Sequence, residues 1–513
     1  MNLEFEISHL QRVSQEAWSR LDYEKSEELL RQRQKLSPRD PRLLLDLGFQ
    51  SGLRCDYPKA IEYFEKAIRV AGWQTAAFTA AGFHCLNFSQ PKLAKGYFER
   101  ALKKNPGAVE ILAPLASIYE RLGQLDEAAE LAARTIALDA SNKNVRLVQA
   151  MVWRRRKRIE EAESVLRDIA SQPEADLWLG AHINYELGFN LDQQGRYDEA
   201  VAAFLAAKKI LAPVAANELA KRPIILNQRR AQAEAVSREV LQRFHKGGEK
   251  LLPASRIAFL VGHPRSGTTL LEQVLDAHVD AISSEESTVF IKEAMRSPLR
   301  TLLRNEPNHN IIEVLERSGD ETLQKARATY LRFTESFLGE PVAGRLLLDK
   351  NPSLTPLIPS ISRIFPESRF LIALRDPRDV CLSCFMQPLP INSVSASYLT
   401  LADTIAEYAS VMDFWLTIRG KMSAPWLEVR YEDMVNDLEP VARHVLEFLG
   451  LPWNENVLAF DQHAKSKIVR SPTYAAVAQP IYKTAKGRWR NYEKYLEPHL
   501  AQLEPFIKAF GYE

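Results

Sequence analysis

The sequence predicts an α + α/β fold, in which an N-terminal α-solenoid of helical repeats precedes an α/β domain with a parallel sheet. Two observations support this prediction. Similar residues return every 34 positions in the first two fifths of the chain, as in stacked helix pairs. Beyond about residue 250, three apolar segments are each followed by polar residues and a helical pattern, which indicates parallel strands linked by helices.

The repeat is defined by small and aromatic residues that recur at this interval: Ala60, Phe64 and Ala67 return as Ala94, Phe98 and Ala101. The pattern resembles the tetratricopeptide repeat (TPR), which implies a superhelix whose concave groove binds a protein or peptide. Four copies are clear within 42–172, a fifth covers about 180–212, and 8–40 resemble a degenerate first copy. An array that only packs on the second domain or mediates self-association is the alternative.

The boundaries follow from these patterns. We expect the repeat array over 1–212, a linking or capping helix over the Ala-, Arg- and Glu-rich segment 213–250, and the second domain over 251–513.

The second domain opens with a glycine loop. The segment VGHPRSGTTLLEQVL, from Val261 to Leu275, follows an apolar run and is typical of a strand, a tight loop and a helix. A triphosphate-binding loop has Lys where this chain has Thr268. Because backbone N–H groups at a helix N-terminus bind anions, we interpret the segment as a P-loop-like phosphate site.

Polar residues also follow the other two apolar segments. RLLLDK ends in Asp349 and Lys350, and RFLIALRD ends in Arg375 and Asp376. In an open parallel sheet, ligands bind at the carboxyl ends of the strands. We therefore expect these side chains to lie in one site with the glycine loop.

Several motifs then occur in a specific order over about 255–495: PRSGTTLLEQVLDAH, SSEES, DKNP, FPESRFLIALRDPRDVCLSCF, RYEDMV and FLGLPW. This set resembles the sulfotransferases that use 3′-phosphoadenosine 5′-phosphosulfate (PAPS), nearest the tyrosylprotein sulfotransferases. The resemblance implies an enzyme that transfers a sulfuryl group from PAPS to a hydroxyl or amine, releases 3′,5′-phosphoadenosine and needs no metal.

The resemblance also implies roles for individual residues. Glu286 would be the base for the acceptor, while Arg265 and Lys350 would stabilise the leaving phosphate oxygen. The 5′-phosphate would be held by Arg265, Ser266, Gly267, Thr268 and Thr269, and the 3′-phosphate by Arg375 and Ser383. Tyr431, Ser471 and one of Lys486 and Arg488 would complete the nucleotide site. The alternatives are a solvated acidic turn at Glu286, a surface ion pair at Arg375 and a core aromatic at Tyr431.

The acceptor is left open. Tyrosylprotein sulfotransferases have an Arg two residues after the base, which holds acidic peptides, whereas this chain has Thr288. A peptide, a protein, a glycan or a small molecule would each fit the resemblance. Two other functions remain as alternatives. The first is a P-loop-type nucleotide kinase, which the missing loop Lys disfavours. The second is a non-catalytic TPR adaptor, which the presence of a candidate residue at every catalytic position disfavours.

Composition limits the setting. The 513 residues are 46% hydrophobic, which is ample for packed cores, and 67 basic against 65 acidic residues indicate no general nucleic-acid binding. The chain shows neither a membrane span nor a signal-peptide layout, and its four cysteines do not suggest a disulfide framework. We therefore expect a cytoplasmic protein.

Overall fold

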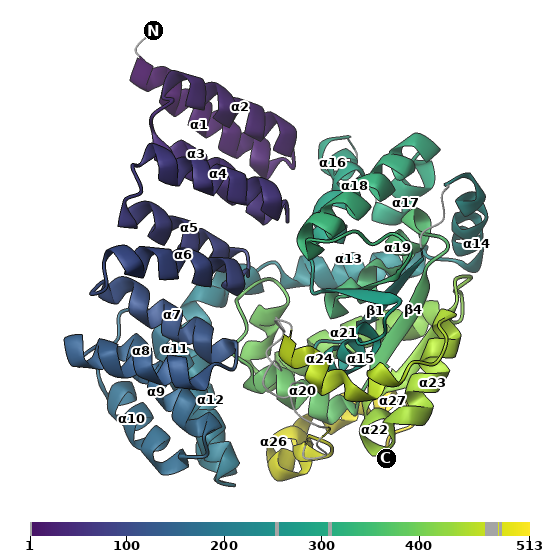
Figure 1. Cartoon of the computed structure of the whole chain (residues 1–513). Coiled ribbons are helices and arrows are strands. Elements are labelled where there is room, and N and C mark those ends of the chain that lie inside the picture. The colour runs from purple at the N-terminus through teal and green to yellow at the C-terminus, as the bar shows by residue number, and fades with distance from the viewer. Residues whose placement is uncertain (1–2, 252–255, 306–309, 467–480, 482–484) are drawn as a thin grey trace. The chain divides into compact units, whose positions relative to one another are not determined.

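The computed structural model describes residues 3–251, 256–305, 310–466, 481 and 485–513 (Figure 1). The chain forms two compact units, of which the first comprises 1–118 with 287–343 and the second comprises 119–286 with 344–513. The chain therefore crosses between units directly after Glu286 and returns shortly before Lys350. The sequence-based domain boundaries stay a prediction.

The first unit contains helix hairpins and the segment 287–343, which we call the crossover because it connects two strands of the sheet. The hairpins are formed by α1 (Leu3–Ser19), α2 (Tyr23–Leu36), α3 (Pro41–Leu53), α4 (Tyr57–Val70), α5 (Thr75–Asn87) and α6 (Pro91–Lys104). The crossover contains the π-helical turn η2 (Phe290–Ala294), α16 (Arg296–Asn305), α17 (Ile311–Arg317) and α18 (Asp320–Leu338). Helix α7 (Val109–Arg121) spans the unit boundary.

Side chains tie the crossover to the first two hairpins within this unit. Lys292 donates to the carbonyl oxygen of Leu53 at 2.7 Å, and the other links are Arg54–Glu293 at 2.8 Å, Arg296–Glu24 at 2.6 Å and Arg300–Asp22 at 2.9 Å. The Glu293 side chain is fully buried, and its counter-charges are Arg54 at 2.8 Å and Arg296 at 4.0 Å.

The repeat residues lie where the two helices of a hairpin touch. A Cβ on Gly82 would lie 2.4 Å from the Phe98 ring, and a Cβ on Gly188 would lie 2.4 Å from the Phe204 ring. A side chain at either glycine would therefore force the helices apart. This contact explains why small and aromatic residues alternate along the array.

The second unit begins with further helices and continues into the sheet domain. The helices before the sheet are α8 (Leu125–Leu138), α9 (Lys143–Arg155), α10 (Ile159–Ser171), α11 (Leu177–Gln193), α12 (Tyr197–Leu219), α13 (Arg222–Ala235), α14 (Arg238–Lys246) and the turn η1 (Gly247–Lys250). The segment 213–250, for which we expect one linking or capping helix, thus holds the end of α12 and two further helices.

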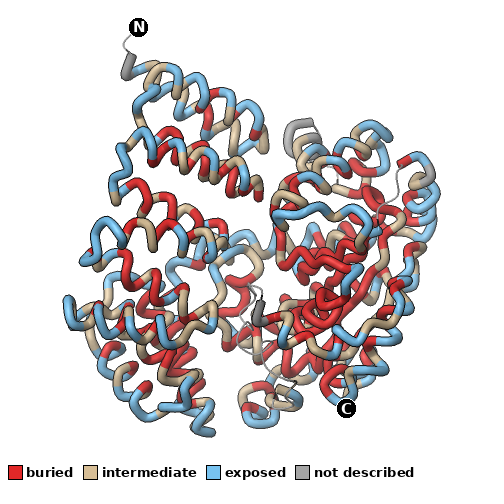
Figure 2. Tube along the Cα trace, viewed as in Figure 1, coloured by how far each residue is buried: buried red, intermediate tan, exposed pale blue. Residues whose placement is uncertain are grey.

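A five-stranded parallel sheet forms the centre of the domain, in the order β2-β3-β1-β4-β5. The strands are β1 (Ile257–Gly262), β2 (Ala281–Glu285), β3 (Leu346–Lys350), β4 (Arg369–Leu374) and β5 (Trp426–Arg430). The predicted parallel sheet is confirmed, and the three apolar segments form its central strands. Every residue of β1, β2 and β3 is buried, as the red tube in Figure 2 shows.

Helices cover both faces of the sheet. One face packs on α15 (Thr268–Asp276), α22 (Tyr431–Asn436) and α23 (Leu438–Leu449), with Leu260, Leu348 and Leu371 in the shared core. On the other face, the Phe259 ring contacts Phe365, which follows α19 (Ile358–Ile364).

The remaining elements surround the carboxyl ends of the strands or follow the sheet. They are η3 (Pro352–Leu357), α20 (Pro377–Met386), η4 (Ser395–Leu399), α21 (Leu401–Arg419), η5 (Glu455–Ala459), α24 (Phe460–Ser466), η6 (Arg488–Tyr492), α26 (Glu493–Leu496), η7 (Glu497–His499) and α27 (Leu500–Ala509).

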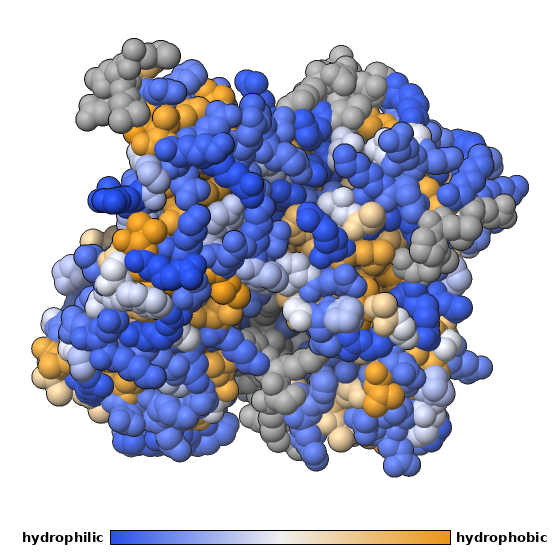
Figure 3. Space-filling view, turned by 45° about the horizontal axis from the view of Figure 1, so that its top comes forward, coloured by the Kyte–Doolittle hydropathy of each residue, from blue (hydrophilic) through white to orange (hydrophobic). Residues whose placement is uncertain are grey.

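The face shown in Figure 3 is mostly hydrophilic, with hydrophobic residues in small groups. No helix in the described parts of the chain combines the length and the apolarity that crossing a bilayer requires.

Candidate functional site

A glycine loop joins β1 to α15. At its start, a Cβ on Gly262 would lie 2.5 Å from the Ala373 carbonyl oxygen, so the close approach of β1 and β4 requires glycine. The Thr355 hydroxyl accepts from the Gly262 N–H at 2.9 Å and donates to the Gly262 carbonyl oxygen at 2.6 Å. The start of the loop is therefore packed against β4 and hydrogen-bonded to Thr355 of η3 before the chain turns into the helix.

Two residues of this loop have left-handed backbone conformations. Arg265 has φ of +73° and Gly267 has φ of +95°. For a residue other than glycine, such a conformation costs on the order of 1–3 kcal/mol and is concentrated at functional sites. This geometry turns the N-terminus of α15, with Thr268 and Thr269, toward a cavity.

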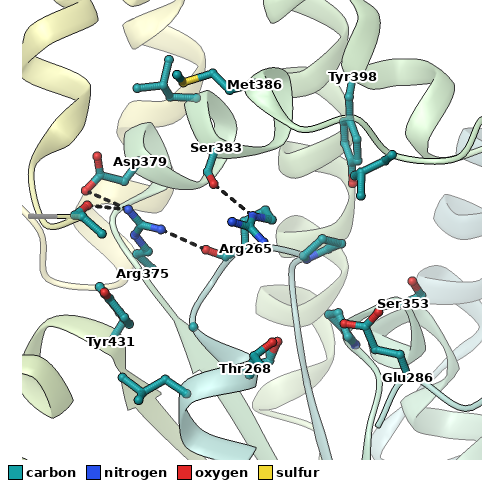
Figure 4. Close-up of a pocket in the computed structure, with 18 of the residues that line it drawn as sticks. Arg265, Thr268, Glu286, Ser353, Arg375, Asp379, Ser383, Met386, Tyr398 and Tyr431 are labelled. Atoms are coloured by element: carbon teal, nitrogen blue, oxygen red, sulfur yellow. Dashed lines mark hydrogen bonds and ion pairs between the residues drawn. The ribbon is translucent and has the colours of Figure 1, made fainter. Parts of the chain in front are cut away.

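The cavity has a volume of about 520 Å³ and lies at the carboxyl ends of the strands. The residues that line it come from segments of the sheet domain that lie far apart in the sequence. The predicted site residues that line it are Arg265, Gly267, Thr268, Thr269, Glu286, Arg375, Ser383, Tyr431 and Arg488. Arg265 lies near its centre, with Arg375 and Tyr431 on one side and Glu286 on the other (Figure 4).

Arg375 follows β4 and connects several parts of the site. Its guanidinium donates to the Arg265 carbonyl oxygen at 3.3 Å and to the Ala485 carbonyl oxygen, and it lies 5.0 Å from the Tyr431 ring centroid. The neighbouring contact between Arg265 Nε and the Ser383 hydroxyl is 3.0 Å long. Arg375 Nε is buried and has no hydrogen-bond partner in the described chain, which suits an anionic oxygen of a ligand.

Asp379, which was not predicted, fixes the C-terminal segment beside Arg375. It accepts hydrogen bonds from the Gly487 N–H at 2.7 Å and the Trp489 N–H at 2.8 Å, and lies 3.6 Å from Arg375. Burial raises the pKa of Asp379, although Arg375 and the two N–H groups oppose that shift.

Lys350, at the end of β3, is fully buried among three carboxylates. Its ammonium lies 2.9 Å from Glu286, 3.2 Å from Glu272 and 3.6 Å from Glu285. Burial by itself would lower the pKa of Lys350, but the three negative charges together raise it. The lysine is therefore protonated at neutral pH and carries the positive charge of this cluster.

Glu286 is the member of this cluster that faces the cavity. Its side chain is 36% exposed, whereas that of Glu285 is 10% exposed. Its backbone has φ of +48°, and its N–H donates to the Lys350 carbonyl oxygen at 2.7 Å. Burial opposes ionisation, but the charge and hydrogen bond of Lys350, followed by the charges of Arg265 and Arg121, hold the pKa of Glu286 below its usual value. The carboxylate is therefore ionised at neutral pH.

Comparisons with known proteins agree with this arrangement. Residues 258–455 match the model of the sulfotransferase family, and 88–152 and 181–210 match tetratricopeptide repeat models. The chain carries a sulfotransferase domain and TPR repeats.

The sulfotransferase domain is similar to that of named relatives. Protein-tyrosine sulfotransferase 1 of Danio rerio is 26% identical over 50% of this chain and 72% of its own length, and the human protein of that name is 27% identical over 50% and 70%. An uncharacterized protein of Aquifex aeolicus is 24% identical over 81% of this chain and 53% of its own length, so this chain spans about half of that relative. Among solved structures, the sulfotransferase domain from the curacin biosynthetic pathway is 17% identical, covers 51% of this chain and 99% of its own, and gives a TM-score of 0.33.

Three residues predicted for the sulfotransferase site are described but do not line its cavity. Ser266 is buried, and its hydroxyl has no hydrogen-bond partner among the described residues. Lys350 is enclosed by its carboxylates, and Lys486 donates to Asn436 at 3.3 Å on the surface. Arg488 lines the cavity and pairs with Asp192 at 2.6 Å. Ser471 lies outside the described residues.

The sequence interpretation missed Glu272, whose signal was visible. Glu272 lies on α15 among apolar residues at helical spacing, where a charge requires a buried partner. It also accepts a hydrogen bond from the Ser283 hydroxyl. Across the described chain, no group of three or more His, Cys, Asp or Glu side chains is arranged to hold a metal ion.

Proposed function

We propose that the sulfotransferase domain transfers a sulfuryl group from PAPS to a hydroxyl or amine acceptor. The observation that carries this proposal is the single cavity into which the glycine loop, the Arg375–Ser383 region and Glu286 all project. These residues lie far apart in the sequence, and the parallel topology brings the ends of their strands to one edge.

The donor would bind on the Arg375 side of Arg265. The N-terminus of α15, with Thr268 and Thr269, suits the 5′-phosphate, since backbone N–H groups and the helix dipole favour an anion. The buried Arg375 with its unpartnered Nε, together with Ser383, suits the 3′-phosphate. Tyr431 and Arg488 complete the wall on this side.

In the proposed reaction, the acceptor oxygen attacks sulfur while the bond between sulfur and the bridging phosphate oxygen breaks. The acceptor proton passes to the ionised Glu286 carboxylate, and the electron pair of the broken bond remains on the 5′-phosphate of 3′,5′-phosphoadenosine. Arg265 stabilises that developing charge. Because the cavity holds these groups at fixed positions, orientation contributes much of the rate.

Lys350 contacts Glu286 directly, so we propose that it keeps this carboxylate ionised and oriented. Its predicted action on the leaving oxygen requires the ammonium to leave at least one of its carboxylates when donor binds.

We further propose that the TPR repeats recruit a protein or peptide partner, which is either the acceptor or a protein that delivers it. Tyrosine in a peptide is one candidate acceptor, because relatives of the domain are named protein-tyrosine sulfotransferases.

Two measurements test the proposed function. Calorimetry should show that the full chain binds 3′,5′-phosphoadenosine much more tightly than ATP, because the site offers a second phosphate pocket at Arg375 but no loop lysine. Incubation with ³⁵S-labelled PAPS and host lysate should then label an acceptor, and Glu286→Gln should slow the labelling by roughly 10²-fold or more. Preference for ATP, or labelling by Glu286→Gln at the wild-type rate, would refute the proposal.

A further inference from the structure

The cavity has a wall without any charge. Residues 380–402, which run from α20 through η4 into α21, contain no Asp, Glu, Lys, Arg or His, although 26% of the chain is charged. This segment contributes Leu382, Met386, Leu389, Val394 and Tyr398 to the lining. Tyr398 lies on the Glu286 side of Arg265, away from Arg375 (Figure 4). The part of the uncharged wall around Tyr398 therefore faces the space that the proposed function leaves to the acceptor, whereas the part around Ser383 lies on the donor side.

A buried lysine from a repeat helix supports this wall from behind. Lys208 lies on α12, inside the match to the TPR model at 181–210, and is only 4% exposed. Its ammonium donates to the Tyr398 carbonyl oxygen at 2.6 Å and to the Tyr185 hydroxyl at 3.4 Å, and lies 4.3 Å from the Phe385 ring centroid. Two of these three contacts belong to the uncharged segment.

Among the described residues, no carboxylate lies within ion-pair distance of Lys208. Burial lowers the pKa of Lys208 to about 7. Removing an ammonium from water without a paired charge is unfavourable, so an apolar residue would be the better choice for packing alone. The position of the ammonium is explained by the hydrogen bond that it donates to the backbone of the wall.

Two arginines of the next helix, α13, differ from Lys208 because each has a counter-charge. Arg222 pairs with Asp403, and Arg229 pairs with Glu407 at 2.8 Å and donates to Ser410 at 2.8 Å. These links join α13 to α21 through ordinary ion pairs beyond the end of the uncharged segment. Lys208 is thus distinguished by direct contact with a residue that lines the cavity.

We propose that Lys208 is a positioning residue that fixes the cavity wall at 395–399, so that the last repeat forms part of the site. The assignment of this wall to the acceptor rests on the proposed function, whereas the anchoring of the wall does not. A repeat array that served only as a tether would leave the wall unchanged when Lys208 is replaced.

The test measures amide hydrogen exchange in the full chain. Lys208→Met keeps the length and volume of the side chain but removes the donor, so exchange within 395–399 should accelerate by about tenfold while exchange in β1 and α15 stays unchanged. The affinity for 3′,5′-phosphoadenosine should stay within about threefold of wild type, because the donor side does not contact Lys208. Lys209→Met, at the exposed neighbouring position of α12, is the matched control and should change neither quantity.

A second variant separates hydrogen bonding from packing. Lys208→Gln is a poorer fit but retains an N–H donor, so its exchange within 395–399 should fall between wild type and Lys208→Met. Exchange in Lys208→Gln that equals or exceeds that of Lys208→Met would overturn the proposal, as would an unchanged wall in Lys208→Met. Failure of both variants to fold would assign Lys208 to the stability of the whole unit and would also overturn it. If the wild-type chain did not bind 3′,5′-phosphoadenosine, the proposed function would be refuted instead.

Discussion

Replacing Gly267 by alanine tests the glycine loop most directly. An added Cβ would lie 2.7 Å from Tyr431 Cδ2 and 3.1 Å from Tyr431 Cβ, and φ of +95° is unfavourable for alanine. The backbone conformation alone costs on the order of 1–3 kcal/mol. Because Tyr431 also stacks on Arg375, relief of the clash would move the residue proposed to hold the 3′-phosphate.

We expect Gly267→Ala to lower the unfolding free energy by about 2 kcal/mol and to weaken binding of 3′,5′-phosphoadenosine by about tenfold or more. Urea unfolding and calorimetry measure the two effects. Gly96→Ala is the matched control, since Gly96 lies in α6 with no atom within 4 Å of an added Cβ. That variant should be unchanged in binding and more stable by up to about 1 kcal/mol. If Gly267→Ala bound nucleotide as tightly as wild type, the proposed role of the loop would be wrong.

Four further predictions concern charged side chains of the second unit. Glu286→Gln should reduce single-turnover ³⁵S transfer by roughly 10²–10⁴-fold with little change in nucleotide affinity, whereas Glu285→Gln should retain most of the activity. Lys350→Met removes the cation that contacts Glu272, Glu285 and Glu286, so chemical denaturation should show a loss of about 3–5 kcal/mol in unfolding free energy. In wild type the acid limb of kcat/KM due to Glu286 should lie below pH 4.5. In Lys350→Met this limb should move upward, because only the charges of Arg265 and Arg121 then oppose the effect of burial on the pKa of Glu286. An unmoved limb would contradict the pairing of Lys350 with Glu286. Between pH 7 and 10.5, Lys208 is protonated in the unfolded chain but largely neutral in the folded chain. The contribution of Lys208 to the unfolding free energy should therefore rise with pH by up to about 1.4 kcal/mol per unit. Unfolding of Lys208→Met across this range should lack that slope.

The central strands and the glycine loop could be predicted because their signals are local. β1 and β4 are almost wholly apolar, β3 begins with three leucines, and the loop is marked by its glycines. β2 and β5 were missed because neither has more than two apolar residues in succession: Ser283, Ser284 and Glu285 make up most of β2, and Glu428 interrupts β5. Short mixed segments of this kind become strands only through pairing with β3 and β4.

The electrostatic organisation of the site could be predicted only in part. The sequence indicated that Lys350 and Glu286 are functional, yet their 2.9 Å contact depends on the adjacency of β2 and β3, which are separated by the whole crossover. The contacts of Asp379 with the Gly487 and Trp489 N–H groups join segments more than a hundred residues apart. Such contacts have no local sequence pattern, because they form only when distant elements meet at the same edge of a sheet.

The hydrogen bonds and ion pairs between the crossover and the first hairpins limit which parts of the chain can be deleted. If the first hairpins were deleted, the buried Glu293 carboxylate would lose both hydrogen bonds from Arg54 and keep only the ion pair with Arg296 at 4.0 Å. The same crossover starts one peptide bond after Glu286. Deletion of the first hairpins should therefore destabilise the crossover, which begins next to the candidate base Glu286. These hairpins are thus not modules that can be exchanged independently of the crossover.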